Sequence, residues 1–193
     1  MAPMRIFTGI ALGDEVRRNV LKELEPFRKA GVPLRWADEL NLHLTLKFIG
    51  EVAEPVAERA GAALEALPPV PPFRLRLRGF GKFPGGDGLN VLWAGVEESP
   101  ELHALFRGVE DALAPLGIGR DTRPFHPHVT LGRSKARSGR GGDGFHGVIS
   151  LLREKGDVFF GEWQLAAYRL YSSRLTPDGP FYTVLKEIPL VES

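Results

Sequence analysis

Residues 43–46 read His-Leu-Thr-Leu, and residues 128–131 read His-Val-Thr-Leu. Side chains two positions apart on a β-strand lie on the same face. The histidine and threonine of each copy would therefore share one face, while the aliphatic residues would face the other way, where helices can cover them. Each copy predicts a strand that presents an imidazole beside a hydroxyl on a hydrophobic base.

The two copies are 85 residues apart, and the same offset relates several elements expected around them. It carries a helix predicted at 14–29 onto one at 99–114, a helix at 54–67 onto 139–152, and a strand at 5–12 onto 90–97. The shared offset predicts an internal duplication of one long unit, with copies at approximately 1–85 and 86–193. We expect a single two-lobed domain over residues 1–193, with equivalent residues facing each other across a groove.

The elements around the motifs indicate the fold class. The helix at 14–29 carries an apolar stripe, and the run FRLRLR from Phe73 to Arg78 alternates as a half-buried strand does. Further strands are expected at 42–49, 89–96, 128–131, 158–160, 162–171 and 181–188, with a short helix at 145–152. This mixture predicts an α+β fold. We expect two antiparallel sheets related by a pseudo-twofold axis, with helices on the outer faces and a central cleft.

Composition narrows the classes of function. The 193 residues include 25 Lys plus Arg and 24 Asp plus Glu, so the overall charge does not favour or exclude nucleic acid as a partner. There is no cysteine, which excludes disulfides, cysteine zinc sites and thiol nucleophiles. The sequence has no signal-like segment and no apolar run long enough to span a membrane, so we expect a cytoplasmic location and no membrane partner.

Two facing imidazoles fit acid–base chemistry at phosphorus. One neutral histidine can take a proton from an attacking water while one protonated histidine gives a proton to the leaving oxygen. The hydroxyls of Thr45 and Thr130 can bind the non-bridging phosphate oxygens, which gain charge in the transition state. We expect His43 and His128 to be this pair, and no metal or other cofactor is needed.

Two other interpretations of the motifs remain. Either histidine alone could be a structural residue, although the repeat at matching places argues against packing as the whole explanation. A metal site would need further ligands, and the remaining histidines, His103, His126 and His146, are not obviously placed to supply them.

The segments NLHLTLKFIGEV (41–52) and RPFHPHVTLGR (123–133) resemble the two signatures of bacterial and archaeal RNA 2′,3′-cyclic phosphodiesterases. This is the LigT/ThpR or 2′-5′ RNA ligase family of the two-histidine phosphoesterases. The resemblance implies metal-independent hydrolysis of a terminal 2′,3′-cyclic phosphodiester to a 2′-phosphomonoester. It also implies that His43 is the proton donor to the leaving O3′ and that His128 is the proton acceptor.

The same resemblance implies a partner and raises alternatives. The substrate would be RNA with a 2′,3′-cyclic phosphate end, tRNA fragments among the candidates, and we expect a monomer. A ligase that joins 2′,3′-cyclic and 5′-hydroxyl ends would use the same chemistry in reverse. A non-catalytic module that only binds RNA ends would not require two imidazoles.

Three residues beside the motifs raise a question of side-chain direction. Arg133 matches a family arginine that approaches the phosphate, but on a regular strand it would face away from His128 unless Gly132 permits a bend. Phe48 matches an aromatic residue near the nucleotide, yet strand alternation places it opposite His43 and favours core packing. The same alternation places Lys47 on the His43 face.

Basic residues gather around the second motif. Between Ile118 and Asp143, six cations face two aspartates, for a local charge of +4 that could hold an RNA backbone. These cations are Arg120, Arg123, Arg133, Lys135, Arg137 and Arg140. Arg74, Arg76 and Arg78 share one face of their strand, and we interpret that stripe as a solvated sheet face.

Overall fold

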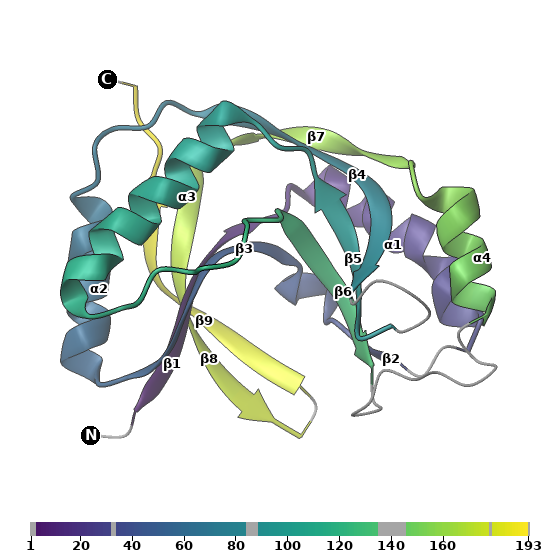
Figure 1. The fold of residues 1–193 in the computed structure, drawn as a ribbon, viewed down its shortest axis with the longest axis horizontal. Coiled ribbons are helices and arrows are strands. Elements are labelled where there is room, and N and C mark those ends of the chain that lie inside the picture. The colour runs from purple at the N-terminus through teal and green to yellow at the C-terminus, as the bar shows by residue number, and fades with distance from the viewer. Residues whose placement is uncertain (1–2, 32–33, 84–88, 135–145, 178, 193) are drawn as a thin grey trace.

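The strands of the molecule form one bent antiparallel sheet (Figure 1). The computed structural model describes residues 3–31, 34–83, 89–134, 146–177 and 179–192. The strands are β1 (Met4–Ala11), β2 (Leu34–Trp36), β3 (His43–Val52), β4 (Phe73–Phe83), β5 (Val91–Val96), β6 (His128–Ser134), β7 (Phe159–Leu165), β8 (Ala167–Thr176) and β9 (Gly179–Pro189). Their order is β7-β4-β5-β6-β3-β1-β8-β9, with β2 paired to β6.

The middle of this sheet is narrow. Strands β3 and β6 pair only at Leu44 and Val129, whereas every other neighbouring pair shares at least three residue pairs. Four strands lie along the path on each side of this junction. The predicted α+β class is therefore confirmed, and the two expected antiparallel sheets are the two halves of one sheet joined at a single residue pair.

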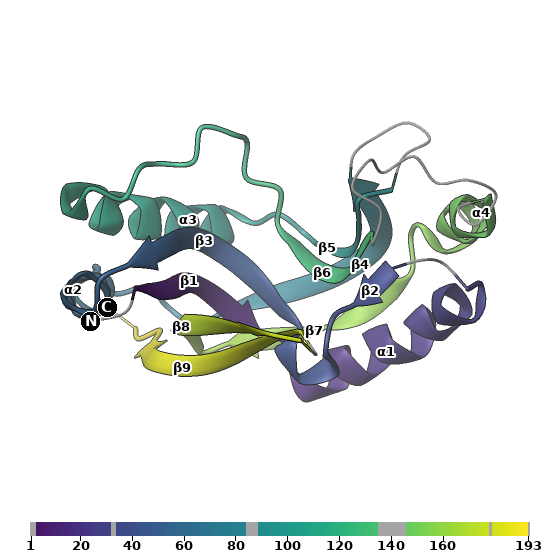
Figure 2. The ribbon, with the colours of Figure 1, turned by 90° about the horizontal axis from the view of Figure 1, so that it is seen from below.

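Four α-helices cover the two halves of the sheet. They are α1 (Asp14–Lys29), α2 (Glu54–Glu65), α3 (Pro100–Leu113) and α4 (His146–Lys155). Helices α2 and α3 pack on each other and on β1, β3 and β9, while α1 and α4 pack on each other and on β7 and β4 (Figures 1 and 2). We call β1, β3, β8, β9, α2 and α3 the first lobe, and β2, β4–β7, α1 and α4 the second lobe.

Each lobe is built from both halves of the sequence. Helix α1 and strand β4 come from the N-terminal half but belong to the second lobe, and α3, β8 and β9 come from the C-terminal half but belong to the first. The expected offset of 85 residues still relates β1 to β5, α1 to α3 and β3 to β6. The lobes therefore exchange elements, and the duplication stays a proposal.

The sequence patterns explain the local structure. The predicted stripe of α1 is fully covered, with Val16, Val20, Leu24 and Phe27 all buried. The helix has two acids in its first turn and two basic residues in its last turn, which complements its dipole. Helix α3 begins at Ser99, whose hydroxyl accepts a hydrogen bond from the Leu102 amide at 3.2 Å.

The alternation of β4 is observed as expected. Phe73, Leu75 and Leu77 are buried, and the intervening arginines lie on the outer face. Arg74, Arg76 and Arg78 form ion pairs there with Glu162, Glu97 and Asp157. The interpretation of this stripe as a solvated face is confirmed.

Some element predictions were wrong or lie outside the described residues. The strand expected at 162–171 is interrupted at Ala166, where the chain leaves β7 of the second lobe and enters β8 of the first. The three-residue strand β2 was missed because it is too short to show alternation. Lys135, Arg137 and Arg140 of the basic segment, and residues 139–145 of the expected helix, lie outside the described residues. None of the helices in the described ranges combines the length and the apolar character needed to cross a membrane.

Candidate active site

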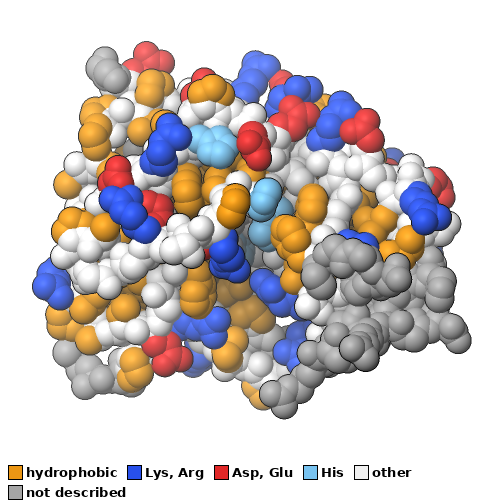
Figure 3. Space-filling view, viewed as in Figure 1, with side chains coloured by type: hydrophobic (Ala, Val, Ile, Leu, Met, Phe, Trp, Pro, Cys, Tyr) orange, Lys and Arg blue, Asp and Glu red, His pale blue; other side chains and the backbone are white. Residues whose placement is uncertain are grey.

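The two histidine motifs meet where the lobes join. His43 and Thr45 lie on β3, His128 and Thr130 lie on β6, and the Leu44–Val129 pair lies between them. By the antiparallel register, His43 stands across from Thr130, and His128 stands across from Thr45. All four side chains are half-buried, while Leu44 and Val129 are fully buried beneath them. Lys and Arg side chains gather along the hollow between the lobes (Figure 3).

Each imidazole is held by a backbone carbonyl two residues before it. The Nδ1 atom of His43 lies 2.7 Å from the Asn41 oxygen, and that of His128 lies 2.7 Å from the His126 oxygen. A carbonyl only accepts, so Nδ1 carries the proton in both rings and Nε2 is left for proton transfer. Thr45 Oγ1 lies 3.1 Å from His43 Nε2 and can donate to it. The two carbonyls are again 85 residues apart.

Both imidazoles favour the neutral form in the free protein. Burial is the main cause that lowers the pKa of His43, and the charges of Arg133 and His128 lower it further. Burial also lowers the pKa of His128, followed by the charges of Arg133 and His126. The bonds to the Asn41 and His126 carbonyls oppose these shifts only in part.

A β-bulge in each catalytic strand changes which face the following residues occupy. Relative to β1, strand β3 has one extra residue at Leu46, because Gly9 pairs with Thr45 and Thr8 with Lys47. Relative to β5, strand β6 has one extra residue at Leu131, because Trp93 pairs with Thr130 and Leu92 with Gly132. A bulge shifts the alternation by one position. The two bulges occupy equivalent places in the two motifs.

The bulge in β6 brings Arg133 to the cleft. Arg133 pairs with Val91, which lies on the same face of β5 as Trp93, the partner of Thr130. Its charge acts on the pKa of both catalytic histidines. The bend that Gly132 was expected to permit is therefore present. A Cβ on that glycine would lie 3.1 Å from the Trp36 ring, so the position favours glycine for lack of space as well.

The bulge in β3 overturns the expectations for Phe48 and Lys47. Phe48 pairs with Phe7, which contacts the His43 ring, so Phe48 lies on the cleft face instead of in the core. It is 52% exposed, with the Arg5 guanidinium 4.7 Å from its ring centroid. Lys47 was expected beside His43 but lies on the opposite face, 6% exposed and 2.7 Å from Glu110 of α3.

Comparison with known proteins agrees with this geometry. Residues 15–158 match the family model of the 2′-5′ RNA ligase superfamily. The chain belongs to this superfamily. The RNA 2′,3′-cyclic phosphodiesterase of Aeropyrum pernix is 40% identical over 164 residues, which cover 84% of this chain and 90% of the relative. That of Methanocaldococcus jannaschii is 32% identical over 184 residues, which cover 95% and 99%.

Solved structures give the same result. The crystal structure of E. coli LigT in apo form superposes with a TM-score of 0.78 at 25% identity, and the match covers 100% of both chains. The crystal structure of TT0787 of Thermus thermophilus superposes with a TM-score of 0.74 at 33% identity, covering 97% of this chain and 98% of that one. The likeness therefore extends over both lobes.

Aromatic residues enclose the two histidines of this superfamily member, and the sequence analysis missed them. The His43 ring lies 4.8 Å from Phe7 and 5.3 Å from Tyr182, between ring centroids. The His128 ring lies 5.2 Å from Phe83 and 6.1 Å from Trp93. These residues come from other strands, so only the strand order could have revealed them. They supply much of the burial that lowers the histidine pKa values.

Gly9 lets the His43 ring lie close to β1. A Cβ at this position would be 3.2 Å from His43 Cδ2 and 2.9 Å from the Leu44 oxygen. Any larger residue would push the ring or the strand aside.

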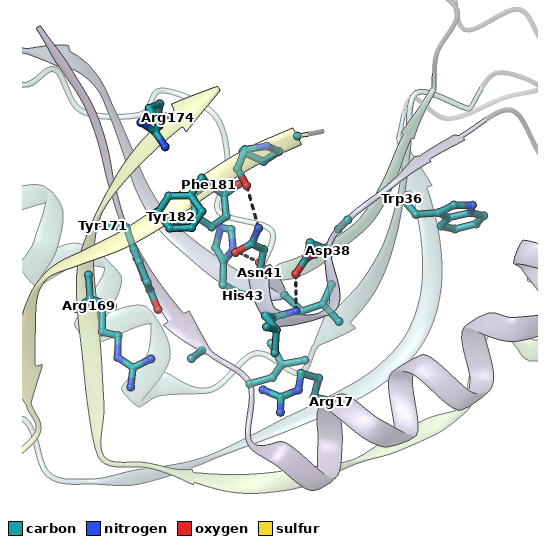
Figure 4. A pocket seen from close by; sticks show the side chains of 18 of the residues that line it. Arg17, Trp36, Asp38, Asn41, His43, Arg169, Tyr171, Arg174, Phe181 and Tyr182 are labelled. Atoms are coloured by element: carbon teal, nitrogen blue, oxygen red, sulfur yellow. Dashed lines mark hydrogen bonds between the residues drawn. The ribbon is translucent and has the colours of Figure 1, made fainter. Parts of the chain in front are cut away.

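A pocket of about 680 Å³ adjoins His43 on the side of the first lobe (Figure 4). Its walls come from the β8–β9 hairpin, from the segment 35–43 and from the start of α1. Four arginines line it, namely Arg17, Arg35, Arg169 and Arg174. His126 and His103 were candidate metal ligands in one interpretation, but within the described residues no three His, Asp or Glu side chains group as a metal site.

Proposed function

We propose that this protein hydrolyses RNA 2′,3′-cyclic phosphodiester ends to 2′-phosphomonoesters with His43 and His128 as an acid–base pair. The observation that carries the proposal is the paired arrangement of the imidazoles. Each has Nδ1 bonded to a carbonyl and Nε2 free, on facing strands in one cleft. The names of the relatives from Aeropyrum pernix and Methanocaldococcus jannaschii support the same activity.

The reaction is an in-line displacement. His128 Nε2 takes a proton from water, the water oxygen forms a bond to phosphorus, and the bond from phosphorus to O3′ breaks. His43 Nε2, protonated in the complex, gives its proton to O3′, and the product keeps the phosphate on O2′. The near symmetry of the centre does not assign the two roles, which rest on the family resemblance.

Three more residues act on the phosphate in this proposal. Thr45 and Thr130 donate hydrogen bonds to the non-bridging oxygens, and Arg133 supplies a positive charge. A bound phosphate anion offsets the effect of Arg133 on the imidazoles and favours protonation of His43. No step uses a metal ion.

Product analysis tests the proposal directly. An RNA that ends in a 2′,3′-cyclic phosphate is expected to give a 2′-phosphate end at the same rate with and without a chelator. Loss of activity with the chelator would show that a metal is required. A 3′-phosphate product would contradict the assigned roles of the histidines, and salt-sensitive binding without turnover would indicate a module that only binds RNA.

Ligation stays the alternative, since it is the same displacement run backwards with an RNA hydroxyl in place of water. A nicked stem-loop with 2′,3′-cyclic and 5′-hydroxyl ends would reveal the position of this equilibrium. The half-exposed cleft admits water, which favours hydrolysis. A cytoplasmic location, a monomeric state and tRNA fragments as substrate stay predictions.

The pH dependence follows from the two histidines. We expect kcat/KM to be bell-shaped with its maximum below pH 6.5, because the pKa values of both imidazoles lie below that ordinary value in the free protein. The active form has one neutral and one protonated ring, and it is most populated between the two pKa values.

Arg133→Met provides the check on this pH profile. Removing the positive charge stabilises both imidazolium ions, so both limbs should move to higher pH while the maximal rate falls. Arg74→Met, on the outer face of β4 and paired with Glu162, should leave the profile in place. A maximum above pH 7, or a profile that Arg133→Met leaves unmoved, would contradict the assignment.

A further inference from the structure

The pocket beside His43 is open to a ligand larger than a phosphate. It lies between the β8–β9 hairpin and the segment that holds β2 and the 3-10 helix η1 (Glu39–Asn41) (Figure 4). The Asn41 amide donates to the Pro180 carbonyl at 2.9 Å and ties the hairpin to this segment. Asp38 accepts from the Leu40 amide at 2.9 Å, so both polar side chains already have partners within the wall.

Two of the four arginines in the pocket have no acidic partner among the described residues. Arg17 pairs with Asp14 and Arg169 pairs with Glu187. Across the described part of the chain, no carboxylate lies within ion-pair distance of Arg35 or Arg174. The pocket therefore presents two positive charges that its described surroundings do not compensate.

The position of Arg35 points to an anion. Arg35 stands directly opposite Arg133 in the pairing of β2 with β6. Like charges at facing positions of a sheet destabilise it. A negatively charged group between the two guanidiniums removes this cost, so the pair is suited to a ligand that carries phosphates on both sides of His43.

An aromatic surface lies beside Arg174. Phe181 is 57% exposed, pairs with Arg174 across the β8–β9 ladder, and has its ring centroid 5.8 Å from the Arg174 guanidinium. Tyr182, the next residue, packs edge-on against His43. An exposed ring beside a cation is the usual platform for a stacked nucleobase in single-stranded RNA sites.

The chemistry decides which part of the RNA reaches this pocket. If His43 protonates O3′, as in the proposed function on which this inference rests, the ribose of the terminal nucleotide lies on the His43 side of the phosphorus. The strand must then continue in its 5′ direction past His43. We propose that the pocket binds the nucleotide upstream of the cyclic end, with Arg35 and Arg174 on its phosphodiesters and Phe181 against a base.

The protein would accordingly favour oligonucleotides over mononucleotides. Wild-type kcat/KM should be higher for a short RNA with a 2′,3′-cyclic end than for a 2′,3′-cyclic mononucleotide, and should fall with salt for the RNA. In Arg35→Ala/Arg174→Ala, this preference should be lost while mononucleotide hydrolysis is retained. The salt slope for RNA should become shallower by about 0.7 for each phosphate contact removed. Phe181→Leu should lower RNA affinity without changing the salt slope.

The control and the contrary results are well defined. Arg74→Ala/Arg76→Ala removes two arginines from the outer face of β4 and should change neither substrate preference nor salt slope. Equal kcat/KM for the two substrates in the wild type, or a preference that survives in Arg35→Ala/Arg174→Ala, would overturn the inference. If the wild type hydrolyses neither substrate, the proposed function fails. Fluorescence anisotropy with an RNA ending in a 2′-phosphate then still decides, since weaker binding by the double variant supports the pocket and equal binding refutes it.

Discussion

Replacing either catalytic histidine with alanine is expected to abolish most of the hydrolysis of a 2′,3′-cyclic phosphodiester. His128→Ala removes the group that takes the proton from water, and His43→Ala removes the group that protonates O3′. Each proton transfer contributes about a hundredfold to ten-thousandfold in rate, so kcat should fall by that factor in each variant. Because the pair acts as a unit, the double variant should be only slightly slower than the single ones.

His103→Ala is the matched control for these variants. His103 lies on α3 and contacts Glu98, outside the cleft. Its removal should leave kcat unchanged. Circular dichroism and thermal unfolding should show all four variants folded, because His43 and His128 are only half-buried. Activity within tenfold of wild type in either catalytic variant would rule out the acid–base pair.

Replacing Lys47 with methionine is expected to cost about 3–5 kcal/mol of the free energy of unfolding, since it leaves a buried charge without its partner. Lys47 Nζ lies 2.7 Å from Glu110 Oε1, in an ionic contact without hydrogen-bond geometry, and both side chains are 6% exposed. The ammonium also donates to the Gly119 carbonyl at 2.7 Å. The other Glu110 oxygen accepts from the Asp121 amide at 3.1 Å.

These contacts connect β3, α3 and the segment that leads to His128. Lys47→Met should therefore lower the midpoint of urea unfolding with little change in the slope. The double variant Lys47→Met/Glu110→Met should recover part of the loss, because no unpaired charge remains.

Lys186→Met is the control for the buried ion pair. Its partner Glu65 is exposed on the first lobe, and removing such a surface pair should cost less than about 1 kcal/mol. Equal effects of Lys47→Met and Lys186→Met would show that the Lys47–Glu110 pair contributes no more than a surface contact.

The sequence predicts the catalytic pair and the fold class because both depend on local patterns. The His-x-Thr motifs alternate over four residues, and the helices carry complete apolar stripes, so no long-range information is needed. The antiparallel halves follow from the same alternation and the repeat. The family resemblance then supplies roles that the symmetric geometry leaves open.

The predictions fail where a single extra residue changes the strand. The bulges at Leu46 and Leu131 invert the alternation, so Phe48 lies in the cleft and Lys47 lies in the core, against expectation. Nothing in the local sequence marks a bulge at Leu46. At Leu131 the following Gly132 is a signal, and the bend expected there is found.

The pocket could not be predicted for another reason. Its walls join residues from α1, the segment 35–43, β8 and β9, which are distant in sequence. Their proximity depends on the exchange of elements between the lobes. The aromatic neighbours of His43 and His128 come together in the same way.

This exchange of elements also bears on how a newly made chain becomes active. The first lobe needs β9, which ends at Pro189, and the second lobe needs β7, which ends at Leu165. Neither lobe can close on the ribosome while these C-terminal strands are still inside the exit tunnel. Each histidine strand waits for partners translated much later, so premature termination yields a polypeptide without an assembled catalytic centre.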